Sequence, residues 1–164
     1  MITTARLLLR PLVPGDVPAI YTMSLEPALG KWIPDQVYRD EEHAEEVVLM
    51  LIEMATHRDP RDKPFVLGLE ERETGALIGH VGLSKARGSV EIGYAIAERL
   101  HGRGLATEAV TAMTDWALRE LGLPEVLGIV ATANVSSCRV LEKAGYVYTG
   151  DKPAGIAVYR RTAA

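Results

Sequence analysis

The sequence is poor in several features that mark specialised protein classes. Its single cysteine, Cys138, excludes an internal disulfide and favours a cytoplasmic protein. No stretch approaches the ~18 uncharged apolar residues of a membrane span, and the short, arginine-flanked apolar run at the start lacks a signal-peptide pattern. His43 and His57 have no partner at metal-ligand spacing, so no metal site is expected.

Basic residues are also too few for a nucleic-acid coat protein. Lysine and arginine number 18 against 22 acidic residues, which gives a formal net charge of -4 at pH 7. That balance argues against general binding to nucleic acid. An anionic ligand would therefore need a local cluster of hydrogen-bond donors.

A large apolar fraction is present instead. Hydrophobic residues make up 48% of the 164 positions and charged residues 24%, which predicts a well-packed core and no long disordered segment. Neither an internal repeat nor a linker interrupts the chain, so residues 1–164 are expected to form one domain.

Local patterns predict a series of short elements. A proline ends an apolar run at 5–10, which predicts an edge strand, and Asp16 is a candidate N-cap for a helix over 17–24. Prolines and a glycine interrupt 25–38, which predicts a loop there. Asp40 caps the clearest early helix, at 41–56. The other predicted elements are strands at 65–69, 77–83, 90–96, 126–131, 146–149 and 156–160 and helices at 104–121 and 135–143.

The order of these elements predicts an α/β fold. The three strands between 65 and 96 follow one another through short turns, which is typical of an antiparallel meander. The strand–turn–helix–strand unit from 90 to 131 should instead place its two strands side by side and parallel, through a right-handed crossover. We therefore expect a mixed, mostly antiparallel twisted sheet of about seven strands, flanked by about four helices.

The turn that opens the helix of this crossover, 101–106, reads HGRGLA. Glycines let the backbone turn tightly, and the first N–H groups of a helix lack internal partners at its positive end. The turn is thus a candidate cradle for a phosphate or diphosphate, with charge added by Arg103 and Arg99, although a plain tight turn explains the glycines equally well. The Gly-Lys-Ser/Thr ending of a P-loop is absent. Thr107 and the lack of an acid after the next strand argue against a dinucleotide fingerprint.

Three motifs in this sequence resemble those of one family. Residues 91–94 (EIGY) and 101–109 (HGRGLATEA) are similar to the acetyl-CoA-binding motif of the GNAT superfamily of N-acetyltransferases. In the family pattern Gln/Arg-x-x-Gly-x-Gly/Ala, His101, Gly104 and Ala106 take the first, fourth and sixth positions, so the histidine is a departure. Residues 134–146 resemble the second motif of the family. The opening, RLLLRP, resembles the branch of ribosomal-protein N-terminal acetyltransferases (RimJ/RimL-like).

The resemblance implies a GNAT-like fold and a set of ligand contacts. Members transfer acetyl from acetyl-CoA to an amine, usually in a ternary complex without an acyl-enzyme. Their loop amides hold the diphosphate, and the central strand, here 94–96, pairs with the pantetheine amides where it diverges from the next strand. The positions that the resemblance assigns to acetyl-CoA are Tyr94, Ala95, Ile96, His101, Gly102, Arg103, Gly104, Leu105, Ala106, Thr107, Asn134, Ser137, Arg139 and Lys143.

Two side chains are candidates for catalysis. In many relatives a tyrosine in the second motif serves the leaving thiolate, but Leu141 stands at that position. Ser137 matches a serine that the ribosomal-type branch places near the coenzyme sulfur, where it either donates a hydrogen bond or caps its helix. Strand alternation places Glu91 on a face of small residues, where it could take the amine proton directly or through water; the alternative is a solvated glutamate.

We therefore predict an acetyl-CoA-dependent N-acetyltransferase that acts on a primary amine, either a protein N-terminal α-amine or a small-molecule amine. The alternative is a catalytically weak acyl-CoA-binding sensor, because the familiar tyrosine is absent. Acetyl-CoA and the amine acceptor are the expected partners, with no nucleic acid, no membrane and no metal. Formation of a homodimer is left open.

Overall fold

Strands and helices alternate along the chain in the computed structural model, which describes residues 1–150 and 153–163. Within those residues the strands are β1 (Ile2–Thr3), β2 (Leu7–Arg10), β3 (Phe65–Glu71), β4 (Leu77–Ala86), β5 (Ser89–Ile96), β6 (Glu125–Ala131), β7 (Val147–Tyr148) and β8 (Ile156–Thr162). The α-helices are α1 (Val17–Ser24), α2 (Pro27–Trp32), α3 (Glu41–Ala55), α4 (Leu105–Glu120) and α5 (Val135–Lys143). Short 3₁₀ helices include η1 (Pro14–Asp16), η2 (Pro34–Gln36) and η3 (Glu98–Leu100).

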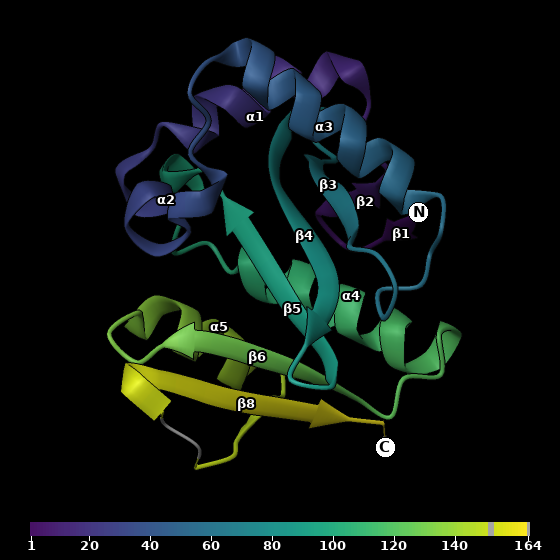
Figure 1. Ribbon diagram of the computed structural model, residues 1–164, viewed down its shortest axis with the longest axis vertical. Coiled ribbons are helices and arrows are strands. Elements are labelled where there is room, and N and C mark those ends of the chain that lie inside the picture. The colour runs from purple at the N-terminus through teal and green to yellow at the C-terminus, as the bar shows by residue number, and fades with distance from the viewer. Residues whose placement is uncertain (151–152, 164) are drawn as a thin grey trace.

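The described strands form one sheet of eight, in the order β1-β2-β3-β4-β5-β6-β8-β7. Neighbouring strands are antiparallel except β5 and β6, which are parallel. The predicted meander is confirmed as β3, β4 and β5, and α4 makes the predicted crossover from β5 to β6 (Figure 1). The α/β prediction is confirmed, with eight strands and five α-helices in the described residues in place of about seven and four.

Two elements that the sequence did not predict, β1 and α2, are short, and α2 has a contact with a distant part of the chain. β1 is a two-residue strand that pairs with β2, with Ile2 opposite Leu9. α2 begins at Pro27, within the segment expected to be a loop, and Glu98 accepts a 2.5 Å hydrogen bond from the backbone N–H of Ala28 in its first turn. Because Glu98 lies 70 positions from Ala28, no local pattern could indicate this contact.

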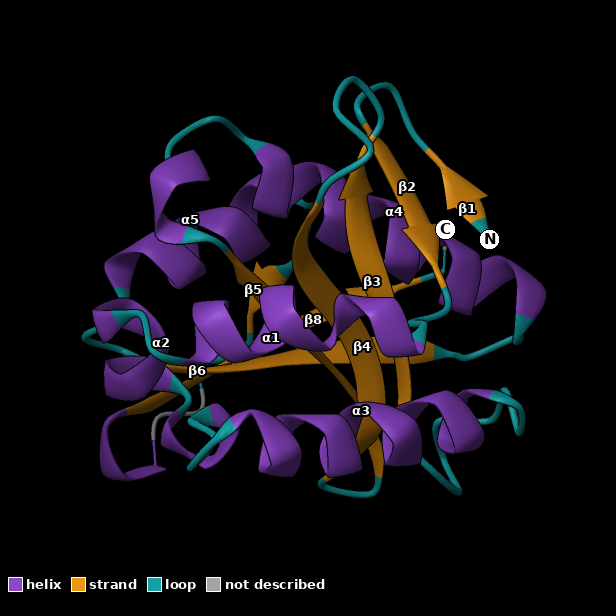
Figure 2. Cartoon of the chain, turned by 90° about the horizontal axis from the view of Figure 1, so that it is seen from above, coloured by secondary structure: helices purple, strands orange, loops and turns teal. Residues whose placement is uncertain are grey.

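Helices cover both faces of the central strands. α1, α2 and α3 lie on one side of the sheet and α4 and α5 on the other (Figure 2). The larger core fills the side of α4, where Ile92 of β5 belongs to the same buried cluster as Met113 of α4. A second buried cluster, which includes Val17 and Val48, lies beneath α1 and α3. No helix in the described part of the chain has both the length and the apolar character to cross a bilayer.

Asp16 occupies the N-cap position of α1, but its side chain makes no capping hydrogen bond there. Its carboxylate accepts hydrogen bonds from the guanidinium of Arg10 at 2.8 and 3.0 Å and from the N–H of Val13 at 2.8 Å. Burial would raise the pKa of Asp16, but the hydrogen bonds from Arg10 and Val13 outweigh it and lower that pKa. The predicted capping role is therefore wrong: Asp16 joins β2 to the start of α1.

Candidate active site

The strands β5 and β6 meet at a single residue pair. Their parallel pairing joins Glu91 to Leu127, although β5 continues to Ile96 and β6 to Ala131. Beyond this pair the two strands diverge (Figure 1). The predicted divergence is confirmed, and it leaves the C-terminal half of β5 without a strand partner on the side of β6 in the described sheet.

The turn between η3 and α4 holds a row of unpaired backbone donors. Gly102 and Gly104 both have a φ of 76°, in the left-handed region that favours glycine. Among the described residues, the backbone N–H groups of 102–107 donate no hydrogen bond, and the first bond of the helix runs from the N–H of Glu108 to the carbonyl of Gly104 at 3.0 Å. The donors lie at the positive end of a helix of 16 residues, so they can bind an anion such as a diphosphate.

His101, which departs from the family pattern, contacts the end of β5. Its Nε2 donates a hydrogen bond to the carbonyl oxygen of Ile96 at 2.7 Å. The ring therefore anchors the turn against the strand, and the bond occupies one of the two lone pairs of that carbonyl. Among the described residues, the N–H groups of the turn donate no hydrogen bond to this side chain.

Glu91 is half-buried on β5 and lies directly opposite Ser84 of β4. Burial raises the pKa of Glu91 above its ordinary value, while a hydrogen bond from Ser84 and the charge of Arg87 act in the opposite direction. A carboxylate with a raised pKa is a stronger base than an ordinary glutamate, which suits it to accept a proton. Sequence reasoning did not find Ser84, because its position opposite Glu91 depends on the register of two strands.

The face of the sheet that carries Glu91 is open at Gly93. In the register of β4 and β5, Gly82 lies opposite Gly93 and His80 lies opposite Ala95, so all four share this face with Glu91. A Cβ added at Gly93 would meet no atom within 4 Å. Burial lowers the pKa of His80 to about 4, so its imidazole is neutral at pH 7. A substrate can therefore approach Glu91 across Gly93.

The start of α5 lies next to the diverging strands. Asn134 caps this helix by accepting a hydrogen bond from the N–H of Ser137 at 3.2 Å, so the alternative in which the Ser137 side chain is the cap is wrong. The Ser137 hydroxyl is half-buried and lies within reach of the Tyr94 hydroxyl, where its side-chain hydrogen bond acts to lower the pKa of that phenol. The hydroxyl of Tyr94 donates to the carbonyl of Ser137 at 3.2 Å, which ties β5 to α5. Burial raises the pKa of Tyr94 to about 12, so its phenol stays protonated.

Other predicted positions lie farther along α5. Arg139 and Lys143 are exposed, one helical turn apart. Leu141, where many relatives have a tyrosine, is 1% exposed and belongs to the core. It packs against Gly128, where an added Cβ would lie 2.7 Å from its terminal carbons. The position of the familiar acid is thus filled by a core residue.

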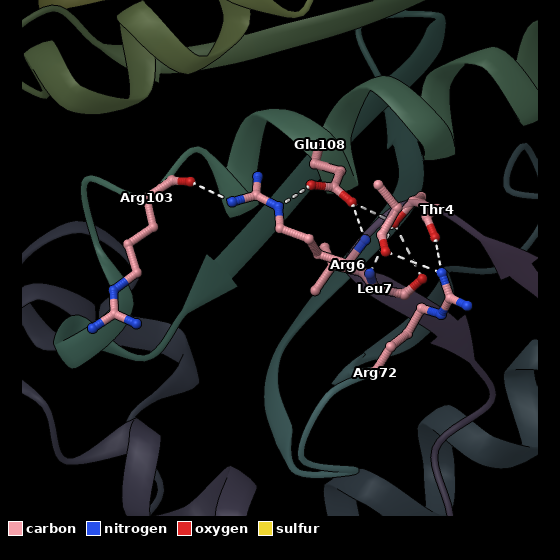
Figure 3. Close-up of polar contacts among 7 residues, drawn as sticks. Thr4, Arg6, Leu7, Arg72, Arg103 and Glu108 are labelled. Atoms are coloured by element: carbon pink, nitrogen blue, oxygen red, sulfur yellow. Dashed lines mark hydrogen bonds and ion pairs between the residues drawn. The ribbon is translucent and has the colours of Figure 1, made fainter.

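A further group of residues contacts the turn from the start of the chain. Arg6 donates a hydrogen bond to the carbonyl of Arg103 and pairs with Glu108 (Figure 3). Sequence reasoning gave no site role to Arg6. The sequence feature that could have indicated a role for Arg6 is that it begins one of the three motifs that resemble the family.

Comparisons with known proteins agree with this geometry. A family model described as an acetyltransferase (GNAT) domain matches residues 6–147. The uncharacterized N-acetyltransferase YnaD of Bacillus subtilis is 27% identical over 146 residues, which cover 88% of this chain and 81% of YnaD. An acetyltransferase structure of the GNAT family from Bacillus anthracis has a TM-score of 0.84 at 23% identity, over 98% of this chain and 97% of that one. The structure of RimL, a ribosomal L7/L12 alpha-N-protein acetyltransferase in complex with coenzyme A, has a TM-score of 0.81 at 18% identity, over 97% and 95% of the two chains. At these identities the two structures support the fold alone.

Proposed function

Because this chain belongs to the GNAT family of acetyltransferases, we propose that residues 1–164 form one domain that transfers an acetyl group from acetyl-CoA to a primary amine. The chain is an N-acetyltransferase, as the family and its named relatives are. The finer proposal concerns the co-substrate, the direct attack within a ternary complex, the residues that assist it and the acceptor.

The observation that carries the proposal is the row of unpaired N–H groups at 102–107. These donors fit a diphosphate because they combine free hydrogen-bonding capacity with the positive end of α4. Next to them, the backbone of 94–96 has no strand partner on the side of β6 in the described sheet, so it can pair with the amides of a pantetheine arm. A ligand with both parts, such as acetyl-CoA, matches both features.

Acetyl-CoA supplies a thioester whose carbonyl carbon forms the new C–N bond while the C–S bond breaks. Glu91 takes the proton that the attacking amine must lose, directly or through a water molecule. An N–H of β5 within 94–96 donates to the thioester oxygen and stabilises the charge that develops there. Ser137 donates a hydrogen bond to the leaving thiolate, a role supported by its half-buried place at the start of α5, next to the diverging strands.

The acceptor is either a protein N-terminal α-amine or a small-molecule amine. The resemblance of the RLLLRP opening to the ribosomal-protein branch favours the α-amine. The open surface at Gly93 supports access for either class, because the approach to Glu91 is not closed by a neighbouring side chain at this position.

Calorimetry with acetyl-CoA, CoA and NAD tests the binding part of the proposal. We expect the first two ligands to bind and NAD not to bind; failure of acetyl-CoA and CoA to bind would contradict the proposal. Thiol release with a panel of peptides and small amines then tests turnover. Binding without thiol release from any acceptor would favour the alternative of an acyl-CoA-binding sensor.

Replacing Glu91 with glutamine tests the proposed base. We expect Glu91→Gln to lower the rate of acetyl transfer by about a hundredfold or more, with little change in affinity for acetyl-CoA. An unchanged rate across the pH range would remove Glu91 from the mechanism.

The cytoplasmic location and the homodimer stay predictions.

A further inference from the structure

A polar cluster joins the start of the chain to the turn before α4 (Figure 3). The carboxylate of Glu108 accepts hydrogen bonds from the hydroxyl of Thr4 at 2.6 Å, from the backbone N–H of Arg6 at 2.8 Å and from Nε of Arg6 at 2.7 Å. The same guanidinium donates through Nη1 to the carbonyl oxygen of Arg103 at 2.8 Å. Arg6 therefore bridges the first turn of α4 and the turn that precedes the helix.

The contact with the Arg103 carbonyl determines the direction of an N–H group. That carbonyl and the N–H of Gly104 belong to one planar trans peptide, in which they point in opposite directions. Because the carbonyl points toward Arg6, the N–H of Gly104 points away from Arg6, and it makes no hydrogen bond among the described residues. Gly104 has no Cβ to oppose rotation, so this peptide could turn over if Arg6 did not hold it.

We propose that Arg6 and Glu108 are positioning residues for coenzyme binding. Arg6 holds the 103–104 peptide so that the N–H of Gly104 is presented to the diphosphate, and Glu108 holds Arg6. The inference rests on the proposed function, because it requires that the turn bind the coenzyme. Without Arg6 the peptide samples both orientations, and the apparent affinity falls in proportion to the competent fraction.

Glu108 is suited to hold Arg6 because it is enclosed and charged. Its side chain is 17% exposed, against 49% for Arg6. Burial would raise the pKa of Glu108, but hydrogen bonds from Thr4 and Arg6 outweigh burial and bring that pKa below its ordinary value. A carboxylate that stays ionised and already accepts three hydrogen bonds is a poor acid or base at neutral pH, so its role is to orient Arg6.

Arg6 also brings positive charge to the turn. The test must therefore distinguish electrostatic attraction of the coenzyme by Arg6 from the effect of Arg6 on the orientation of the 103–104 peptide. Its Nη2 lies 3.6 Å from where a Cβ on Gly104 would be. Removing the charge of Glu108 separates the two effects. By electrostatics alone, the loss of a nearby negative charge would strengthen the binding of an anion, whereas the loss of support for Arg6 would weaken it.

Calorimetry of the full chain with CoA provides this test. In Glu108→Gln, the oxygen that faces Nε of Arg6 becomes an NH₂ group, or the amide flips and loses the bonds from Thr4 and the Arg6 backbone. We expect Arg6→Gln and Glu108→Gln each to raise the dissociation constant for CoA by about three- to tenfold. Arg6→Lys should also bind more weakly, because an ammonium cannot reproduce the guanidinium fork. Affinity equal to or above wild type in Glu108→Gln, or full recovery in Arg6→Lys, would overturn the proposal.

Arg72 offers a matched control on the same segment. Its Nη1 donates to the carbonyl oxygens of Thr4 at 2.7 Å and Ala5 at 3.0 Å, and none of its described hydrogen bonds reaches the turn (Figure 3). Arg72→Gln should therefore keep the wild-type affinity for CoA. A loss as large as that of Arg6→Gln would assign the effect to the N-terminal segment as a whole and overturn the positioning role.

Kinetics distinguishes positioning from a folding defect. Arg6→Gln should raise the KM for acetyl-CoA and leave kcat and the KM for the acceptor unchanged. Turnover of acetyl-pantetheine, which lacks the diphosphate, should not change; an equal loss with both thioesters would overturn the inference. If wild-type protein does not bind CoA, the proposed function fails, whereas equal binding by wild type and both glutamine variants overturns this inference alone.

Discussion

Replacing Gly93 with valine should increase stability while it decreases activity. Gly93 is an exposed glycine inside β5, and an added Cβ would meet no atom within 4 Å. Glycine in a strand costs about 0.5–1 kcal/mol relative to alanine, and valine is favoured in strands. We therefore expect the free energy of unfolding of Gly93→Val to rise by about 0.5–1 kcal/mol, a gain of about 1–4 °C in Tm.

The same side chain would occupy the proposed approach to Glu91. Since both residues lie on one face of β5, the valine methyl groups would stand where the acceptor amine must come close. Misfit of one or two methyl groups in a binding site costs about 1–3 kcal/mol, so kcat/KM for the acceptor should fall by about 10- to 200-fold. The affinity for acetyl-CoA should not change, because the backbone donors of β5 and the turn are retained.

Gly82, directly opposite Gly93 in the register, provides the matched control. A Cβ there would lie 2.8 Å from Cγ2 of Val66 and 3.2 Å from the carbonyl oxygen of Phe65. Gly82→Ala should thus lower the free energy of unfolding by about 1–3 kcal/mol. Thermal unfolding and steady-state kinetics on both variants check these outcomes. Full kcat/KM in Gly93→Val with every acceptor that the wild type uses would refute the approach across this face, and a loss of stability would refute its openness.

Three further changes test the base, an ion pair and the core. Ser84→Ala removes a hydrogen bond that lowers the pKa of Glu91, so the acid limb of the pH profile of kcat/KM should move to higher pH. In Glu91→Gln the same limb should vanish. An acid limb that stays in place in both variants would exclude Glu91 as the base. Asp16→Asn removes from Arg10 a carboxylate that is 5% exposed, while Glu70 remains paired with Arg10 at 2.6 Å, and should cost about 1–3 kcal/mol in denaturant titrations at neutral pH. Because the pKa of Asp16 is lowered in the folded state, the stabilisation by its carboxylate is present above the ordinary aspartate pKa and is lost as pH falls. The difference in the free energy of unfolding between wild type and Asp16→Asn should therefore shrink in acid. A difference that stays constant at all pH values would contradict this. Leu141→Ala, at a position 1% exposed, should cost about 2–5 kcal/mol in the same titrations, and a loss below about 1 kcal/mol would show that the core closes around the gap.

The sequence predicted the part of the candidate site that consists of backbone groups. The glycines at 102 and 104 and the start of the next helix predicted an anion-binding turn, and both glycines have positive φ with free donors beside them. Asn134 and Ser137 were placed together by their motif, but the sequence left open which of them caps the helix. The structure shows that Asn134 does so, because its side chain accepts the bond from the N–H three residues later.

The sequence by itself determined the order of most elements and the location of the turn proposed to bind the diphosphate, because apolar periodicity, proline and glycine act over a few neighbouring residues. The tertiary structure alone decided that Ser84 stands opposite Glu91 and that Arg6 reaches Glu108 across 102 positions of the chain. Strand register and the closure of distant segments set such contacts, and both depend on the packing of the whole sheet rather than on local preference. For the same reason the raised pKa of Glu91 follows from its burial, which no neighbouring residue in the sequence specifies.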